Sequence, residues 1–128
     1  MIEYLDLDDL LVAADAAVGG RAAVRDVGLL QASAARPQAS AFGEDAYPDI
    51  DQKAAALLHA IVTGHPLVDG NKRLGWVAAR LFCLRNGADL AAPADDAFAL
   101  VIAIAAGEMD DIPAIASRLR AWRTGAAD

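Results

Sequence analysis

Two apolar segments, 50–63 and 74–84, lie on either side of a short polar stretch near the middle of the chain. In the first segment, apolar residues recur every three or four positions, as in an amphipathic helix, and Asp49 followed by Gln52 indicates a capping box at its start. The second segment is apolar on almost every side, which is typical of a helix buried within a bundle. These two segments predict a helical fold with 74–84 as its central helix.

The rest of the chain predicts four further helices and one irregular segment. Apolar spacing, N-cap residues and stop signals at glycine or proline place these helices at about 7–18, 26–35, 93–107 and 111–122. In the second of them, Val27, Leu30 and Ala34 are expected to share one face. Periodicity disappears between 37 and 48, which predicts a loop or a short hairpin. The predicted fold class is therefore all-α, a compact bundle of about six helices with a short flap or hairpin before the central helices.

A chain of 128 residues is long enough to bury its own core, so we expect a single domain over 1–128. The formal net charge of −7 argues against a general nucleic-acid surface, because phosphate would be repelled. The lone cysteine, Cys83, lies in an apolar segment, which predicts a buried thiol in a reducing compartment. No run reaches the ~20 apolar residues of a membrane span, and the first residues lack a signal-peptide pattern. We therefore expect a cytoplasmic protein without direct contacts to membrane or nucleic acid.

The polar stretch between the two apolar segments, 65–73, carries more reactive groups than any other part of the sequence. Helical periodicity resumes at Asn71, so this residue and Gly70 lie at a helix N-terminus, where free backbone N–H groups favour an anion. Glycine also lets a ligand approach the backbone closely. Lys72 and Arg73 add positive charge at the same place. This end of the stretch predicts a phosphate-binding site.

Two further groups in the stretch are suited to chemistry on a bound phosphate. Asp69 is placed to hold Mg²⁺ between its carboxylate and phosphate oxygens, and His65 is placed to act as general base toward a hydroxyl. A zinc site made from His65 with Asp69 or His59 is disfavoured because a third ligand is not apparent, and the Walker phosphate-loop pattern is absent. Each residue alone also fits an ordinary capping or surface role. Their grouping is what indicates an active site.

The segment 65–73, His-Pro-Leu-Val-Asp-Gly-Asn-Lys-Arg, resembles the core motif of the Fic/Doc family, His-Pro-Phe-x-[Asp/Glu]-Gly-Asn-[Gly/Lys]-Arg, which joins two helices. Leu67 stands where phenylalanine is usual and is expected to fill an apolar anchor beneath the loop. With Lys72, the motif is similar to that of the Doc branch, the death-on-curing toxins of bacterial toxin–antitoxin pairs. Trp76 stands where the AMP-transferring branch has a second arginine. Other stretches, such as 36–48, support the resemblance.

The resemblance implies the compact all-α Fic fold, with residues 37–48 as a flap beside the active site that docks a target segment as an added strand. It assigns a role to each motif residue: His65 as the catalytic base, Asp69 as the Mg²⁺ ligand, and the nucleotide- and phosphate-binding set Gly70, Asn71, Lys72 and Arg73.

The activity implied by the resemblance is that of a protein kinase. Such an enzyme transfers the γ-phosphoryl group of ATP, with Mg²⁺, to a Ser or Thr hydroxyl of elongation factor Tu or another translation factor, and so arrests translation. Two alternatives remain open: AMP transfer on the same fold, and a catalytically idle binding module of a toxin–antitoxin complex. The implied partner is a small Phd-like antitoxin acting in trans, because the inhibitory motif that some relatives carry in their own chain is not clearly present here.

Overall fold

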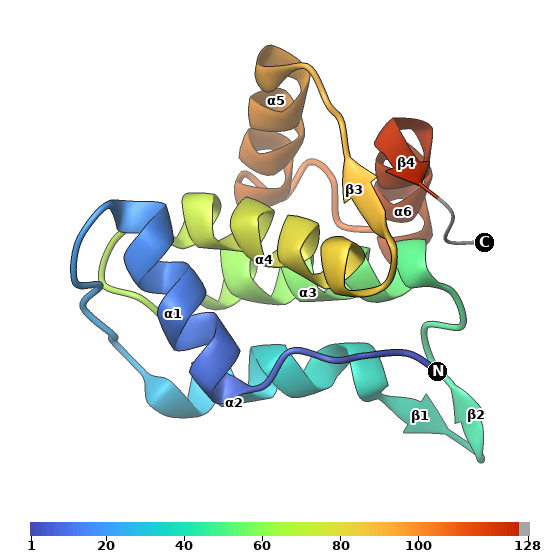
Figure 1. Ribbon diagram of the computed structural model, residues 1–128, viewed down its shortest axis with the longest axis horizontal. Helices are drawn as coiled ribbons and strands as arrows, with labels where there is room; N and C mark the ends of the chain where they lie inside the picture. The colour runs from blue at the N-terminus through green and yellow to red at the C-terminus, as the bar shows by residue number, and fades with distance from the viewer. Residues whose placement is uncertain (126–128) are drawn as a thin grey trace.

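The computed structural model describes residues 1–125 and consists mainly of six α-helices (Figure 1). Their bounds are α1 (Leu7–Val18), α2 (Val27–Ala35), α3 (Ile50–Gly64), α4 (Asn71–Arg85), α5 (Ala94–Ala105) and α6 (Ile112–Trp122). A 3-10 turn, η1 (Arg36–Gln38), follows α2. Short strands form two antiparallel pairs, β1 (Ser40–Ala41) with β2 (Glu44–Asp45) and β3 (Ala88–Leu90) with β4 (Arg123–Gly125). The predicted all-α bundle is confirmed.

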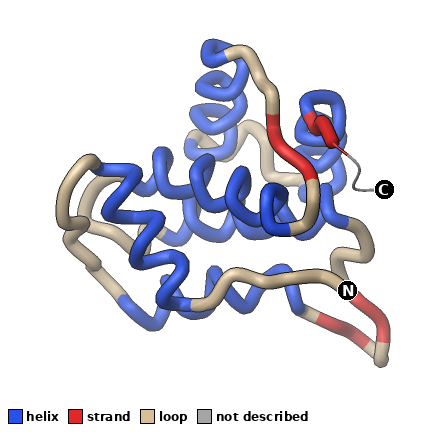
Figure 2. The backbone as a smooth tube through the Cα atoms, viewed as in Figure 1, coloured by secondary structure: helices blue, strands red, loops and turns tan. Residues whose placement is uncertain are grey.

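The centre of the molecule is the pair α3 and α4, which run in opposite directions and pack along their lengths (Figure 2). The two helices are in close contact at Gly75 of α4. A Cβ atom there would lie 2.6 Å from Cγ2 of Val62 and 3.0 Å from Cδ1 of Leu58, both on α3. Glycine in a helix interior costs about 1 kcal/mol relative to alanine, and the structure shows that the missing side chain is what lets the two helices meet.

We expect Gly75→Ala to lower the free energy of unfolding by about 1–3 kcal/mol, despite the better helix propensity of alanine, because the new methyl group overpacks the contact with Val62. Urea unfolding measures this change. Gly64→Ala is the matched control, because a Cβ at Gly64 meets nothing within 4 Å; it should be neutral or slightly stabilising. A stability for Gly75→Ala equal to that of the unsubstituted protein would contradict the close packing.

α3 is more completely buried than α4, which reverses the contrast predicted between an amphipathic and a buried helix. Ten of its 15 residues are buried, against seven of 15 in α4. α4 covers one side of α3, and α6, α2 and η1 cover the others, so even Lys53 is buried. Its Nζ donates to the carbonyl of Pro37 at 3.3 Å and lies 3.3 Å from the carboxylate of Asp45. Even with this burial, no helix within residues 1–125 is long and apolar enough to cross a membrane.

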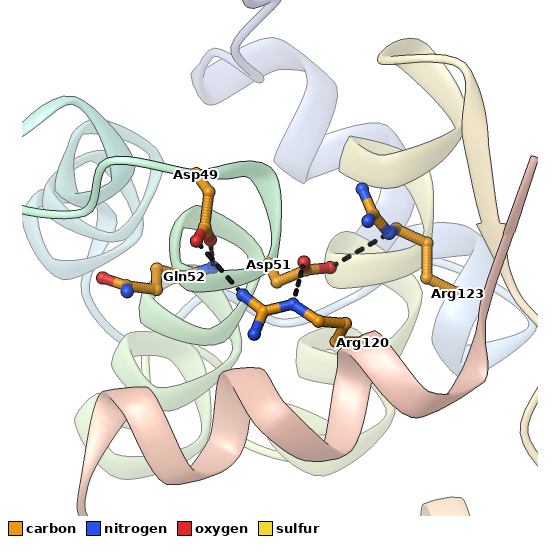
Figure 3. Close-up of polar contacts among 5 residues, drawn as sticks. All are labelled: Asp49, Asp51, Gln52, Arg120 and Arg123. Atoms are coloured by element: carbon orange, nitrogen blue, oxygen red, sulfur yellow. Dashed lines mark hydrogen bonds and ion pairs between the residues drawn. The ribbon is translucent and has the colours of Figure 1, made fainter. Parts of the chain in front are cut away.

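A buried carboxylate on α3 fastens α6 to the centre of the fold (Figure 3). Asp51 is 2% exposed; its Oδ2 accepts a hydrogen bond from Nε of Arg120 at 2.9 Å, and its Oδ1 lies 3.3 Å from Nε of Arg123. Arg120 also donates to Asp49 at 3.1 Å.

The thiol of Cys83 is buried. Its burial, and to a smaller extent the charge of Asp51, raises the pKa of this thiol to about 12. The predicted buried cysteine is confirmed.

Helix starts were the most accurate part of the sequence prediction. Asp26, Asp49 and Asp111 are N-caps whose side chains accept from the backbone of the first turn. The capping box predicted at Asp49 is only half formed, by the bond from the N–H of Gln52; the complete capping box is at Asp6 of α1. One face was predicted wrongly. Leu30 and Ala34 are buried, but Val27 is 55% exposed because it lies at the open first turn of α2.

The segment 37–48 forms a short hairpin, β1 with β2, which turns at Phe42 and Gly43. The hairpin lies at the N-terminal end of α3, whereas the segment 65–73 lies at its C-terminal end (Figure 1). A helix of this length spans about 22 Å. The structure therefore does not place the flap beside the predicted site, and none of its residues lines the groove described below.

Candidate active site

The segment 65–73 joins α3 to α4 through a left-handed residue near each end. His65 is the C-cap of α3, with φ 54° and ψ 56°. Gly70 is the N-cap of α4, with φ 90°. A Cβ at Gly70 would lie 2.6 Å from Cγ1 of Val18, so both the backbone angle and the contact with α1 require glycine.

A buried amide fixes the middle of the loop. Oδ1 of Asn71 accepts from the backbone N–H of Leu67 at 2.8 Å, and Nδ2 of Asn71 donates to the carbonyl of Leu67 at 3.0 Å. The side chain of Leu67 is 1% exposed and packs in the core, as an anchor beneath the loop. Because the Asn71 side chain is occupied in this way, its contribution to an anion site would come from its backbone N–H.

The loop is also held by the last four residues of the connection between α1 and α2, residues 23–26, which we call the brace. The N–H of Val68 donates to the carbonyl of Ala23 at 2.9 Å, and the N–H of Arg25 donates to the carbonyl of Pro66 at 2.8 Å. These bonds join parts of the chain that are about forty residues apart, a pairing that no local pattern in the sequence indicates. The brace is therefore a contributor to the site that sequence reasoning missed.

All six residues predicted as a site line one groove of about 870 Å³. They are His65, Asp69, Gly70, Asn71, Lys72 and Arg73. The side chains of His65, Lys72 and Arg73 are exposed and form no ion pair within residues 1–125. The six residues that the sequence predicts on a single loop therefore all border the same groove.

The walls of the groove come from helices far from the loop in sequence, and sequence reasoning did not identify them. α1 contributes Ala16, Ala17 and Val18; α4 contributes Trp76 and Val77; α5 contributes Ala94, Ala97, Phe98 and Val101. Phe98 is 67% exposed. The three- and four-residue spacing on α5 was a visible signal, but an apolar stripe of that spacing more often faces a core. Only the fold shows which part of the stripe borders the groove.

The chemistry available in the groove is that of an anion site beside a carboxylate. The first N–H groups of α4, at Asn71, Lys72 and Arg73, have no acceptor within the helix, and the helix dipole adds positive potential there. This positive end stands out in a chain of net charge −7. Asp69 accepts from the N–H of Gly70 through Oδ1 at 2.9 Å, which leaves its second oxygen for a cation.

A metal ion in this groove would have to share its ligands with a bound molecule. Within residues 1–125, no three His, Cys, Asp or Glu side chains are grouped to hold a metal by themselves. His59 does not join His65, because its Nδ1 lies 3.0 Å from Nη1 of Arg36 and its Nε2 lies 2.7 Å from the carboxylate of Asp110. The single carboxylate of Asp69 fits Mg²⁺, which usually takes one or two carboxylates together with phosphate oxygens.

The fold and the groove define a class: all-α proteins that present a histidine and an open helix N-terminus on the loop between their two central helices. A family model described as the Fic/DOC family matches residues 4–83, which is more than half of the chain. The protein therefore belongs to the Fic/DOC family. A protein of Mycolicibacterium smegmatis named Toxin Doc is 55% identical over 95 residues, which cover 74% of this chain and 73% of that relative. The residues matched by the family model include the whole loop but end before α5.

Proposed function

We propose that this protein is a Doc-type toxin, a protein kinase that transfers the γ-phosphoryl group of ATP to a Ser or Thr hydroxyl of a translation factor. Membership of the Fic/DOC family and 55% identity to a protein named Toxin Doc support this proposal. The gathering of His65, Asp69 and two cations in one groove supports it independently.

The start of α4 suits the phosphate groups of the nucleotide. The free N–H groups of its first turn are donors for phosphate oxygens, and Gly70 leaves the backbone open to close approach. Lys72 and Arg73 supply the charge that offsets the triphosphate. Mg²⁺, when bound through Asp69, would add further positive charge at the same oxygens.

His65 suits the hydroxyl of the target. Its imidazole is exposed and lies on the wall of the same groove. As the hydroxyl oxygen forms its bond to the γ-phosphorus and the bond to the β-bridging oxygen breaks, the imidazole takes the hydroxyl proton and ADP leaves. The base lies at the C-terminal end of α3 and the phosphate site at the N-terminal end of α4. Because these two helices pack against each other, the distance between base and phosphate is expected to stay fixed.

Lys72 carries the choice of phosphoryl over adenylyl transfer. It stands where the resemblance to the Doc branch is strongest, and Trp76 stands where AMP-transferring relatives have a second arginine. Trp76 packs edge-on against Trp122, with ring centroids 6.2 Å apart. Trp76 also lines the groove, so an aromatic ring and not a cation borders the groove at this position.

The target and the partner belong to the same proposal. By family resemblance the target is elongation factor Tu, so that modification arrests translation. The name of the M. smegmatis relative supports an antitoxin partner, which we propose to be a small Phd-like protein that inhibits in trans.

Incubation of the purified protein with elongation factor Tu, Mg²⁺ and either γ- or α-labelled ATP tests the reaction. We expect label from γ-labelled ATP to reach the factor and label from α-labelled ATP to stay on the nucleotide. Transfer of the α-label would instead establish AMP transfer. Absence of both labels, together with normal growth of cells that express the protein without an antitoxin, would favour the idle binding module.

A further inference from the structure

His65 is held in a backbone conformation that is uncommon for any residue with a side chain. Its φ of 54° lies in the left-handed region, and within residues 1–125 Phe42 is the one other non-glycine residue with positive φ. A Cβ atom crowds the following carbonyl in this region, so the surroundings must hold the conformation in place. At a candidate catalytic base, the group that does so also sets the direction of the imidazole.

The guanidinium of Arg25 contacts the backbone at this point. Its Nε donates to the carbonyl of His65 at 2.7 Å, and its Nη2 donates to the carbonyl of Gly64 at 3.0 Å. Both carbonyls lie at the C-terminal end of α3, where the helix dipole favours a cation. The two donors of a planar guanidinium can bind two neighbouring acceptors at once, which fixes their relative orientation.

Arg25 reaches His65 from the brace, 40 residues earlier in the chain. Its own backbone N–H is fixed by the carbonyl of Pro66 at 2.8 Å, so the side chain is anchored next to the residue it holds. Arg25 does not line the groove. It therefore acts on the loop backbone and has no contact with the space in which a ligand would bind.

We propose that Arg25 is a positioning residue, which holds the His65 backbone in the left-handed conformation and so aims the imidazole into the groove. This role in the reaction rests on the proposed function. The structural part of the inference, that Arg25 fixes the conformation of His65, can be tested without any activity.

The kinetic test compares Arg25→Met and Arg25→Lys with the unsubstituted protein in γ-phosphoryl transfer. We expect Arg25→Met to lower kcat about 10- to 100-fold, because a small misplacement of the base is costly, while the KM for ATP changes less than about threefold. Arg25→Lys should recover part of the rate, since an ammonium group can bind one of the two carbonyls. Arg21→Met, on the same connection, is the matched control, because Arg21 makes no hydrogen bond or ion pair within residues 1–125.

The structural test uses NMR of protein that is isotope-labelled only at its histidines. The chain contains two histidines, His59 and His65. We expect Arg25→Met to shift or broaden the backbone resonances of His65 and to leave those of His59 unchanged, whereas Arg21→Met should alter neither. Unchanged His65 resonances in Arg25→Met would overturn the inference, as would altered resonances with an undiminished kcat.

The two tests separate the possible failures. If the unsubstituted protein transfers no phosphoryl group, the proposed function fails, and the NMR comparison still decides whether Arg25 holds His65. If Arg25→Met does not fold, Arg25→Lys provides the same comparison, because it keeps the charge and loses one of the two hydrogen bonds. A KM for ATP that rises in parallel with the fall in kcat would show a general disturbance of the groove and would also count against the proposal.

Discussion

His65→Ala should reduce γ-phosphoryl transfer about 10²- to 10⁴-fold, the usual contribution of a positioned general base. Nucleotide affinity should change little, because the phosphate donors lie on α4 and the imidazole lies at the end of α3. The measurement is the single-turnover rate at saturating ATP, with affinity measured separately by calorimetry. In cells, the same substitution should abolish growth arrest.

Two variants show whether such a loss of transfer comes from removal of the base or from a disturbed loop. His65→Asn removes the base but keeps a side chain that tolerates the left-handed conformation, so it should be as inactive as His65→Ala. His59→Gln removes the other histidine, which contacts Arg36 and Asp110 away from the groove, and should keep a rate within a few-fold of the unsubstituted protein. Substantial transfer by His65→Asn would exclude His65 as the base.

Asn71→Ala should have the largest effect on the loop itself. It leaves the N–H and the carbonyl of Leu67 without the partners they have at 2.8 and 3.0 Å. Leu67 is 1% exposed, so water cannot easily replace them. A buried polar group left unsatisfied costs about 1–3 kcal/mol. We therefore expect the free energy of unfolding, measured in urea, to fall by about 2–4 kcal/mol, together with loss of transfer.

The chain contains a matched control for this substitution. Asn86 makes the same pair of bonds with the backbone of Glu3, at 2.9 Å each, and its Nδ2 also donates to the carbonyl of Phe82, one turn earlier in α4, at 2.8 Å. Glu3 is exposed, so water can take over the two bonds to Glu3 that Asn86→Ala removes. The loss of stability in Asn86→Ala should accordingly be smaller than in Asn71→Ala. Equal losses would show that burial of Leu67 is not what makes the amide important.

The sequence predicted the helices well because each is specified locally. Asp26 and Asp111 mark N-termini by bonding to the first turn of their own helices, and the segment 65–73 keeps its chemistry within one loop. Residues that are neighbours along the chain need no knowledge of the fold to be grouped. For the same reason, all six predicted site residues were found in one groove.

What the sequence did not reveal depends on distant pairing. β3 and β4 are three residues each and join segments on either side of α5 and α6, too short to stand out as strands. The burial of Asp51 depends on Arg120, 69 residues later, and the hold on His65 depends on Arg25. Glycine is a poor helix former, and only the fold shows that the missing Cβ of Gly75 makes room for Val62 of α3.

Because the chain is made from its N-terminus, the pairing of Asp51 with α6 can form only late in protein synthesis. The loop with His65 leaves the ribosome before α5, which supplies one wall of the groove, and before Arg120, which pairs with the carboxylate on α3. A nascent chain at that stage has the reactive loop but lacks the far wall and keeps an unpaired charge in its centre. The groove is complete only once α5 has been made and has docked, and Asp51 is paired only once α6 has followed, so incomplete chains are expected to lack the finished site.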